Sequence, residues 1–416
     1  MYIMKELTEF VSSHLNEDTA KLLLARSKWP EIDMDLAVNC IESRRKLKGK
    51  VQEWYENPEL IFPARLSAEQ CSSSATAFYK SALAESIAPG YRLADLTGGF
   101  GVDSWFFSKK ASKVLYNEMQ EILCRAAEMN FRNLQAENIE ISNRAVGNGQ
   151  GETSPSEILN GFNPDIVFMD PARRGEGGKK VFLIEECTPD VLTLKDEIFG
   201  ICRHMLIKLS PMADITMVCD RLGQSCREVH VVATGGECKE LLIWMDREWK
   251  GEYTVHAVEL PSDYPNSAPA SFTFLPSEEK VAIASTEGAE SGTYLFEPGK
   301  SLMKAGAYNL ISDRFGIAKL GKSTHYYTLS NEDAIDILYG LGKIYRINSC
   351  EPLDKRTVKA AGKAYPKAEV TARNIPMDTD TLRKKLGVTS GDDAHIFGLK
   401  SDRSGNLLLC TDRVLN

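Results

Sequence analysis

A glycine turn that follows a short apolar stretch constrains the fold of this chain more than any other feature. Residues 93–96 are apolar apart from Asp95, and Gly99 and Gly101 follow closely. Glycine has no Cβ and can adopt positive φ, so the backbone can turn sharply here and come close to a ligand. Asp95, at the end of the predicted strand, can hold this loop or accept hydrogen bonds from a ligand ammonium group. The pattern predicts a strand, a glycine loop and a helix in succession.

The strand predicted at residues 113–118 ends on a second acid. Glu118 lies 23 residues after Asp95, and in doubly wound α/β sheets an acid at this place hydrogen-bonds the ribose hydroxyls of a nucleoside ligand. The helix between the two strands is predicted to be capped by Asp103 or Ser104, which are both suitable N-cap residues. The turn and the two acids therefore predict a nucleoside-binding α/β fold.

Two nucleoside cofactors compete for this arrangement. The dinucleotide fingerprint Gly-x-Gly-x-x-Gly/Ala wraps a pyrophosphate, but counting from Gly99 puts Ser104 at its last position. S-adenosylmethionine has no phosphate and needs no third glycine. Its ammonium and ribose groups call for acids, which Asp95 and Glu118 provide. The residues favour S-adenosylmethionine over a nicotinamide dinucleotide, and hence disfavour a dehydrogenase.

A second motif follows the apolar strand predicted at residues 165–169. Asp170 and Pro171 come directly after it, followed by Ala172 and two arginines. In open α/β sheets, ligands bind at the carboxyl ends of the strands. We therefore expect this acid–proline corner to lie beside the nucleoside site.

These motifs resemble those of class I S-adenosylmethionine-dependent methyltransferases, in the same order and at similar distances. The strings at 95–103, 170–174 and 207–211 resemble more narrowly the bacterial methyltransferases that carry a C-terminal THUMP-like domain. The likeness runs from about Leu66 to the C-terminus. Where an acid often follows the third strand to meet adenine, Asn143 stands here and can accept one hydrogen bond. The resemblance implies S-adenosyl-L-methionine as cofactor, bound by Asp95, Thr97, Gly99, Gly101, Glu118 and Asn143.

The resemblance also implies an amine as methyl acceptor. Amino-group methyltransferases carry Asp/Asn-Pro-Pro-aromatic at this corner, where the acid and a backbone carbonyl accept hydrogen bonds from the amine. In this chain the catalytic pair would be Asp170 and Pro171, while Ala172 replaces the second proline and Arg173 the aromatic. A guanidinium can stack on a base or pair with phosphate. The residues expected to bind the substrate are Gln70, Arg173, Arg174, Lys208 and Ser210.

Methylation of carbon 5 of a pyrimidine is an alternative, because Asp-Pro-Pro-Arg also occurs in enzymes with that activity. Those enzymes place a nucleophilic cysteine just after the fifth strand, where this chain has Lys208 to Pro211. Cys238 lies one strand later and fits a small buried hydrophobe better. Amine methylation is therefore preferred.

Composition limits the class of protein and its partners. The 416 residues are 43% hydrophobic, enough for two or three cores, and the net charge of −8 confines any nucleic-acid-binding face to a local surface. The ten cysteines form no Cys-x-x-Cys pair and no histidines cluster near them. No secretory signal is recognised at Met1 and no apolar run could span a membrane. We expect a cytoplasmic protein without a metal, a membrane or a disulfide-linked partner.

The predicted fold class is α/β, with three structured parts. Residues 1–88 have helical periodicity and form an N-terminal helical domain. Residues 89–252 alternate strands and helices, as in a Rossmann-like, seven-stranded class I methyltransferase sheet. Residues 237–240 join the last two strands by a connection too short for a crossover helix, so the last strand should be antiparallel. Residues 253–335 are a connector packed on the catalytic domain.

Residues 336–416 are predicted to form a THUMP-like, ferredoxin-like α+β domain. The expected order from Gly342 is strand, helix, strand, helix and a final hairpin. The domain is locally basic, which in an acidic chain indicates either a surface for RNA phosphates or a solvated face. Its cations are Lys355, Arg356, Lys359, Lys363, Lys367, Arg373, Arg383, Lys384 and Lys385.

The sequence therefore predicts a methyltransferase that acts on an exocyclic base nitrogen, guanine or adenine, in tRNA or rRNA. One rival is a non-catalytic RNA-binding protein that keeps the methyltransferase fold as a scaffold. The presence of both Glu118 and Asp170 speaks against it, because a scaffold needs neither acid.

Overall fold

The computed structural model describes residues 2–173, 183–330, 333–391 and 394–414. The chain divides into two compact units, which are described one at a time. The first comprises Met1–Val229 and Glu240–Gly251, and the second comprises His230–Lys239 and Glu252–Asn416.

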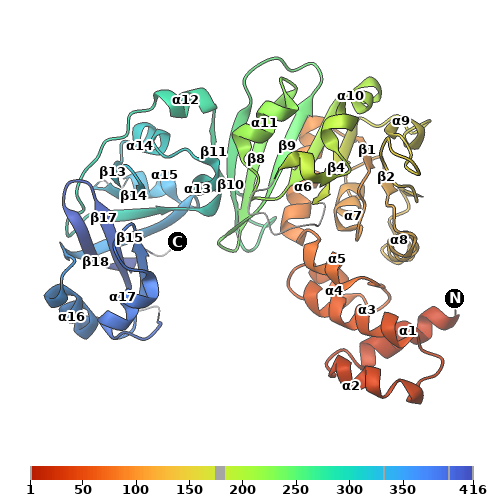
Figure 1. Ribbon diagram of the computed structural model, residues 1–416, viewed down its shortest axis with the longest axis horizontal. Helices are drawn as coiled ribbons and strands as arrows, with labels where there is room; N and C mark the ends of the chain where they lie inside the picture. Colours follow the sequence, from red (N-terminus) through yellow and green to blue (C-terminus); the bar gives the residue numbers. More distant parts are fainter. Residues whose placement is uncertain (1, 174–182, 331–332, 392–393, 415–416) are drawn as a thin grey trace. The chain divides into compact units, whose positions relative to one another are not determined.

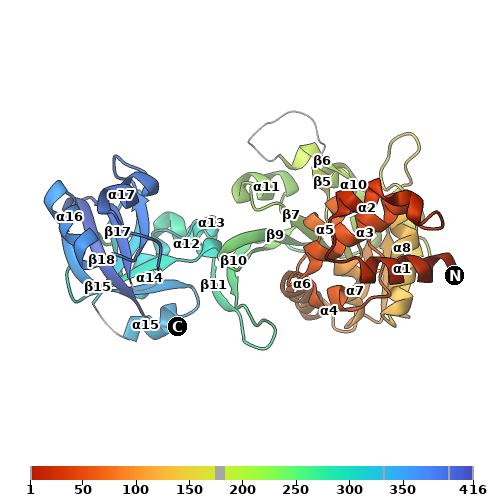
Figure 2. The same cartoon turned by 90° about the horizontal axis from the view of Figure 1, so that it is seen from below.

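The first unit begins with helices, as the periodicity of residues 1–88 predicted. Asp33 caps one of them by accepting from the Leu36 amide at 3.1 Å, and α1 to α3 group together in Figures 1 and 2. The polar segment before the first strand forms two helices, the second of which starts with a capping box between Ser73 and Thr76. The bounds are α1 Tyr2–Ser13, α2 Thr19–Leu24, a 3-10 turn Arg26–Lys28, α3 Met34–Leu47, α4 Gln52–Glu56, α5 Arg65–Gln70 and α6 Ser74–Ile87.

The N-terminal helices share a core with the α/β part of the first unit. The indole of Trp54 lies 6.0 Å from the Phe62 ring and 5.9 Å from the Trp105 indole. Burying such large rings is a major favourable term in folding. The helices therefore pack on the sheet region through α7 (Val102–Ser108), which carries Trp105.

The sheet of the α/β region has nine strands in the order β11-β10-β8-β9-β7-β4-β1-β2-β3. Of these, β10, β11 and residues 230–239 of β8 and β9 belong to the second unit. All seven predicted strands are present, but the predicted total was too low, because β10 and β11, from the segment expected to be a connector, extend the sheet beside β8. β1, β2, β3, β4 and β7 pair in parallel, and β9 pairs antiparallel with β7. The strands are β1 Arg92–Asp95, β2 Lys113–Asn117, β3 Ile139–Ser142, β4 Ile166–Met169, β7 His204–Leu209, β8 Cys226–Thr234, β9 Glu237–Asp246, β10 Thr254–Leu260 and β11 Ala270–Phe274.

Helices and short elements complete the first unit. A two-stranded ladder follows the acid–proline corner, where β5 (Ala172–Arg173) pairs with β6 (Cys187–Thr188). The turn before β9 falls at Gly235 and Gly236, both with positive φ, so residues 237–240 belong to the strand and not to a connection. The helices are α8 Glu121–Asn133, α9 Pro155–Ile158, a 3-10 turn Ile184–Glu186, α10 Val191–Ile201 and α11 Ile215–Leu222.

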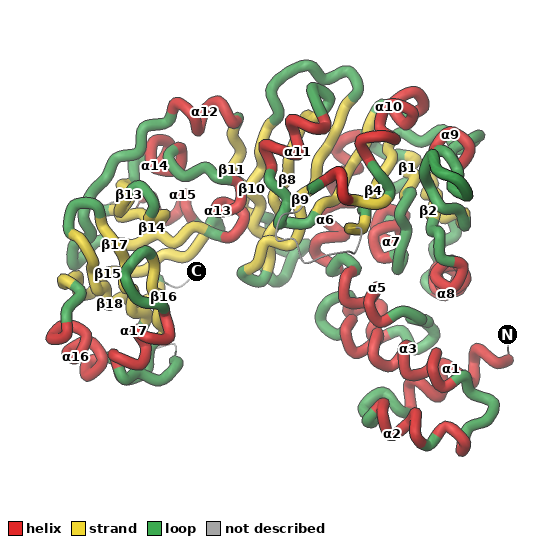
Figure 3. Tube along the Cα trace, viewed as in Figure 1, coloured by secondary structure: helices red, strands yellow, loops and turns green. Residues whose placement is uncertain are grey.

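The second unit contains a seven-stranded sheet in the order β13-β14-β12-β15-β18-β17-β16. From Gly342 onward the elements follow the predicted order, and α16 and α17 lie side by side in Figure 3. The strands are β12 Tyr294–Pro298, β13 Ala318–Gly321, β14 Thr324–Leu329, β15 Gly342–Pro352, β16 Glu369–Arg373, β17 His395–Ser401 and β18 Gly405–Arg413. The helices are α12 Pro276–Val281, α13 Lys300–Ala305, α14 Leu310–Phe315, α15 Asp333–Leu338, α16 Lys355–Ala364 and α17 Thr379–Leu386.

A search of the described helices for a membrane span found none that is sufficiently long and apolar.

Candidate functional site

Asp95 ends β1 and holds the glycine loop. Its side chain is only 1% exposed. It accepts hydrogen bonds from the Thr97 amide at 3.0 Å and from the Ser104 hydroxyl at 2.5 Å. Of the two roles expected for Asp95, these contacts are those of a residue that holds the loop.

The helix after the loop starts earlier than predicted. Gly101, with φ +84°, is the N-cap of α7, so the prediction of a cap at Asp103 or Ser104 was wrong. A Cβ on Gly101 would lie 2.8 Å from Cζ of Phe131, so both its dihedral angle and the close packing require glycine. Ser104 is free to bond Asp95, and Asp103 turns its carboxylate toward α6.

Glu118, directly after β2, binds the backbone on both sides. Its Oε2 accepts from the Gly99 amide at 2.9 Å, and its Oε1 accepts from the Gln120 amide at 2.8 Å. The Tyr116 hydroxyl also donates to the Gly99 carbonyl at 2.7 Å. The ends of β1 and β2, which the sequence predicted to be adjacent, are therefore joined through the glycine loop.

The acid–proline corner is joined to the same loop. The backbone amide of Asp170 donates to Oγ1 of Thr97 at 2.6 Å. Pro171 is buried, whereas the Asp170 side chain is 37% exposed. The structure thus brings the glycine loop, Glu118 and Asp170 to one edge of the sheet, at the carboxyl ends of β1, β2 and β4.

Lys208, on β7, is the direct partner of Asp170. Its Nζ lies 2.5 Å from Oδ2 of Asp170, and its side chain is 13% exposed. Burial is the largest single influence on Lys208 and lowers its pKa, but the nearby carboxylates, Asp170 first among them, together outweigh burial and raise the pKa. Asp103 and Glu240 contribute in the same direction. Lys208 is therefore a fixed cation beside the exposed carboxylate.

A buried ion network lies next to this pair, within the first unit. Lys80 of α6 is completely buried, and its Nζ donates to both carboxylate oxygens of Glu240, at 2.7 and 2.9 Å. The same Nζ lies 3.2 Å from Oδ1 of Asp103 and donates to the Ser72 hydroxyl at 3.0 Å. Ser72 in turn donates to Oδ2 of Asp103 at 2.8 Å. The network joins α6, α7 and β9 with complementary charges.

Near the acid–proline corner, the ion pairs of the described side chains contain more carboxylates than ammonium groups. The two ammonium groups belong to Lys80 and Lys208. The three carboxylates belong to Asp103, Asp170 and Glu240. Burial raises the pKa of Asp95 to about 7, partly offset by its hydrogen bonds from Ser104 and Thr97. The excess of carboxylates among the ion-paired residues favours a cationic ligand, whereas the raised pKa of Asp95 reduces the negative charge that Asp95 contributes at neutral pH.

The remaining predicted residues are placed as follows. Asn143 is exposed, and its Nδ2 donates to the backbone carbonyls of Glu118 and Met119 at 2.7 and 3.1 Å. Ser210 accepts from the Met212 amide at 3.2 Å, and Gln70 is exposed at the end of α5. The backbone of Arg173 lies in β5, and Arg174 lies outside the described residues.

Two residues of the network, Lys80 and Glu240, were missed by the sequence reasoning. Glu240 lies in the segment predicted to be a connection, and Lys80 lies in the predicted N-terminal helical domain, where it belongs to no motif. Their contact spans 160 positions in the sequence. The one available signal was a lysine on the small-residue helix directly before the first strand.

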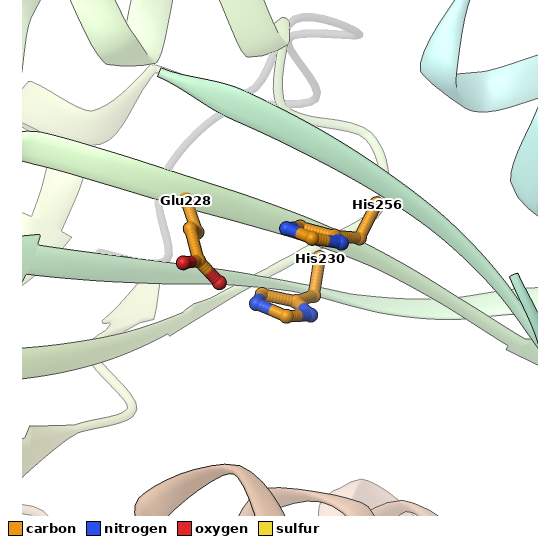
Figure 4. Close-up of side chains that lie close together, drawn as sticks. All are labelled: Glu228, His230 and His256. Carbon is orange, nitrogen blue, oxygen red and sulfur yellow. The ribbon is translucent and has the colours of Figure 1, made fainter. Parts of the chain in front are cut away.

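A separate group of potential metal ligands lies on β8 and β10. The donor atoms of Glu228, His230 and His256 lie within 4.8 Å of one another. Figure 4 shows the two imidazoles stacked face to face, with centroids 4.5 Å apart and planes at 9°. Rings in parallel planes do not direct their nitrogens at one common point, so we assign no metal site to this group.

Comparisons with known proteins agree with this architecture. A family model described as THUMP domain-like matches residues 342–412, and one described as a ferredoxin-like domain matches residues 294–334. The crystal structure of a candidate methyltransferase from Porphyromonas gingivalis W83 is 27% identical with a TM-score of 0.84, covering 99% of this chain and 98% of that chain. No curated protein matches the chain.

Two further solved structures match part of the chain. An rRNA methylase from Streptococcus thermophilus is 13% identical with a TM-score of 0.29, covering 40% of this chain and 93% of that one. A tRNA (m1A58) methyltransferase from Aquifex aeolicus is 15% identical with a TM-score of 0.25, covering 36% of this chain and 50% of that one.

The match over the whole chain and the two family models confirm the resemblance seen in the sequence. The chain has an α/β class I methyltransferase fold and carries a C-terminal THUMP-like domain.

Proposed function

We propose that this protein transfers a methyl group from S-adenosylmethionine to an exocyclic base nitrogen in RNA. The observation that carries the proposal is the 2.6 Å bond from the Asp170 amide to Thr97, because it joins a nucleoside loop to an amine-accepting acid. A methyl donor and an acceptor must lie within reach of each other for in-line transfer.

The residues at the glycine loop fit S-adenosylmethionine. Glu118 is held by two backbone amides, and because a carboxylate has about four acceptor positions, it can also bind the ribose hydroxyls. Asn143, fixed through its Nδ2, offers Oδ1 to the adenine amino group. The excess of carboxylates among the ion-paired residues near the acid–proline corner suits a cationic ligand. When bound, S-adenosylmethionine supplies a methyl group activated by a sulfonium centre.

The acceptor amine would bind at Asp170. The carboxylate and the backbone carbonyl of Pro171 accept the two amine hydrogens, which leaves the nitrogen lone pair directed at the methyl carbon. As the N–C bond forms and the C–S bond breaks, the amine nitrogen loses one proton to the Asp170 carboxylate. No cysteine nucleophile is required, and Lys208 stands where a C5 enzyme would place one.

The THUMP-like domain would supply the contact to RNA. Eight of its nine predicted cations are exposed, and Arg383 is partly buried beside Glu369 at 3.3 Å. Lys359 and Lys363 share helix α16. Such a surface in a chain of net charge −8 can bind phosphates locally.

Calorimetry and methyl transfer test the proposal together. The full chain is titrated with S-adenosylmethionine, and tritium from the labelled cofactor is followed into total RNA from a strain that lacks this gene. We expect a micromolar Kd, label in RNA, and a Kd at least tenfold higher for Glu118→Ala. Binding of RNA without binding of the cofactor at ~100 μM would favour the scaffold, since typical ligand affinities are micromolar.

A further inference from the structure

Lys208 and Asp170 place a hydrogen-bond donor and a hydrogen-bond acceptor side by side at the acid–proline corner. They come from the adjacent parallel strands β7 and β4, with Nζ and Oδ2 2.5 Å apart. Both side chains reach the surface, at 13% and 37% exposure. A group that binds Oδ2 of Asp170 therefore lies close to the Lys208 ammonium.

The hydrogen-bonding capacities of the two groups are fixed. An ionised carboxylate only accepts hydrogen bonds, and an ammonium only donates them, through three hydrogens. One hydrogen of Lys208 goes to Oδ2 of Asp170. The pair can thus bind a ligand edge that places an N–H donor beside a lone-pair acceptor.

The amino groups of the nucleobases differ in whether the neighbouring ring nitrogen is protonated. The amino group of adenine neighbours the unprotonated N1, and that of cytosine neighbours the unprotonated N3. The amino group of guanine lies between N1–H, which is a donor, and N3, whose lone pair is crowded by the ribose on N9. An ammonium that faces N1–H leaves two donors opposed without an acceptor, and buried polar mismatches of this kind are strongly rejected.

We propose that Lys208 is a specificity residue, which together with Asp170 selects an amine next to an unprotonated ring nitrogen. The methyl acceptor is then adenine N6 or cytosine N4 rather than the Watson–Crick edge of guanine. This inference rests on the proposed function and narrows its substrate.

The ion network positions Lys208 for this role. Lys80 is fully buried and holds Glu240 and Asp103, the two carboxylates that act on Lys208 besides Asp170. A lysine side chain has four rotatable bonds, so an unrestrained ammonium would sample many positions. The carboxylates of Glu240 and Asp103 attract the Lys208 ammonium, and the contact with Asp170 holds it at the acid–proline corner.

The first test identifies the methylated base. The full chain is incubated with tritiated S-adenosylmethionine and total RNA from the strain lacking this gene, and the RNA is digested to nucleosides for mass spectrometry. We expect label in N6-methyladenosine or N4-methylcytidine. Label in N2-methylguanosine would overturn the specificity inference and leave the proposed function standing. RNA without label would overturn both.

The second test probes the contact itself. Using the RNA fragment labelled in the first test, the target base is replaced by 1-deazaadenosine or 3-deazacytidine, which keeps the amine but removes the ring acceptor. We expect this change to lower kcat/KM for the wild-type protein about 100-fold, and to have less than a threefold effect on Lys208→Met. Equal losses in both proteins would contradict a direct contact.

Two further variants separate this role from folding. Lys208→Arg keeps the cation and the donors, so it should retain more activity than Lys208→Met and remain sensitive to the deaza base. Lys113→Met removes a lysine from the exposed pair with Glu140 and should behave as wild type. Because the deaza comparison is made within one protein at a time, lower stability of Lys208→Met does not affect its outcome.

Discussion

The hydroxyl of Thr97 accepts a hydrogen bond from the backbone amide of Asp170 at 2.6 Å, across 73 positions of sequence. Thr97 Oγ1 also lies 3.4 Å from Oδ1 of the buried Asp95. One side chain therefore joins the glycine loop to the acid–proline corner. Thr97 therefore fixes Asp170 relative to the glycine loop, where we propose that the cofactor binds.

Removal of this hydroxyl should affect transfer more than cofactor binding. In Thr97→Val the Asp170 amide loses its partner, which costs about 1 kcal/mol and should lower kcat about fivefold to tenfold. The Kd of S-adenosylmethionine should rise no more than threefold. Thr193→Val, which removes a hydroxyl that bonds the Asp190 carbonyl on α10, is the control. A loss confined to cofactor affinity would contradict the assignment.

The basic surface of α16 should contribute salt-dependent affinity. Lys359 and Lys363 are exposed, so Lys359→Gln/Lys363→Gln should weaken RNA binding and reduce the slope of log K against log salt by about one for each lost phosphate contact. Filter binding of total RNA at several salt concentrations measures the slope. The control, Lys322→Gln/Lys343→Gln, removes two exposed lysines elsewhere in the second unit. Identical slopes for both double variants would show that α16 does not contact RNA.

Local features of the site could be predicted from the sequence because they depend on the strand ends. Asp95 and Glu118 follow apolar runs, and parallel strands bring such residues to one edge of a sheet. The structure joins them through Gly99. The N-cap was mispredicted because φ +84° at Gly101 lets the helix begin before Asp103. Because the turn contains several glycines, the residue type alone does not show which of them is the N-cap.

Long-range partners could not be predicted in the same way. The runs at β10 and β11 looked strand-like in the sequence, but the sheet they join is decided by contacts between distant strands. Lys80 and Glu240 meet across 160 positions. Neither residue carries a motif, because an ion pair needs only opposite charges and a shared burial site.

That ion pair should be important for stability. Lys80→Met leaves Glu240 and Asp103 without their buried cation, which should destabilise the first unit by about 3–5 kcal/mol. All five tryptophans, 29, 54, 105, 244 and 249, lie in the first unit. Urea unfolding followed by tryptophan fluorescence therefore reports on this unit.

The double variant provides the internal check. Lys80→Met/Glu240→Gln removes one of the stranded charges, so it should be more stable than the sum of the two single changes predicts. Lys113→Met, in an exposed pair, should lose less than about 1 kcal/mol. Additive effects at Lys80 and Glu240 would contradict the coupling.

Asp95 should make the stability of the first unit depend on pH. Burial raises the pKa of Asp95 from 3.8 to about 7. Between these values the folded protein holds a proton that the unfolded chain has released, so stability falls as pH rises from about 4 to about 7. The full effect is on the order of 4 kcal/mol at pH 8.

Asp95→Asn removes this charge and retains an acceptor oxygen for the Thr97 amide, while the Ser104 hydroxyl can rotate to accept from the new amide. We therefore expect the variant to be more stable than wild type at pH 8, and to match it near pH 4. Urea unfolding followed by tryptophan fluorescence at both pH values measures the difference. Asp196→Asn, which changes an exposed acid on α10, is the control and should give no such pH dependence.

If the charge of Asp95 also attracts the cationic cofactor, Asp95→Asn should bind S-adenosylmethionine more weakly than wild type at pH 8. Stability and cofactor affinity would then change in opposite directions. Equal stability of wild type and Asp95→Asn at pH 8 would mean that the buried carboxylate is fully compensated by its hydrogen bonds.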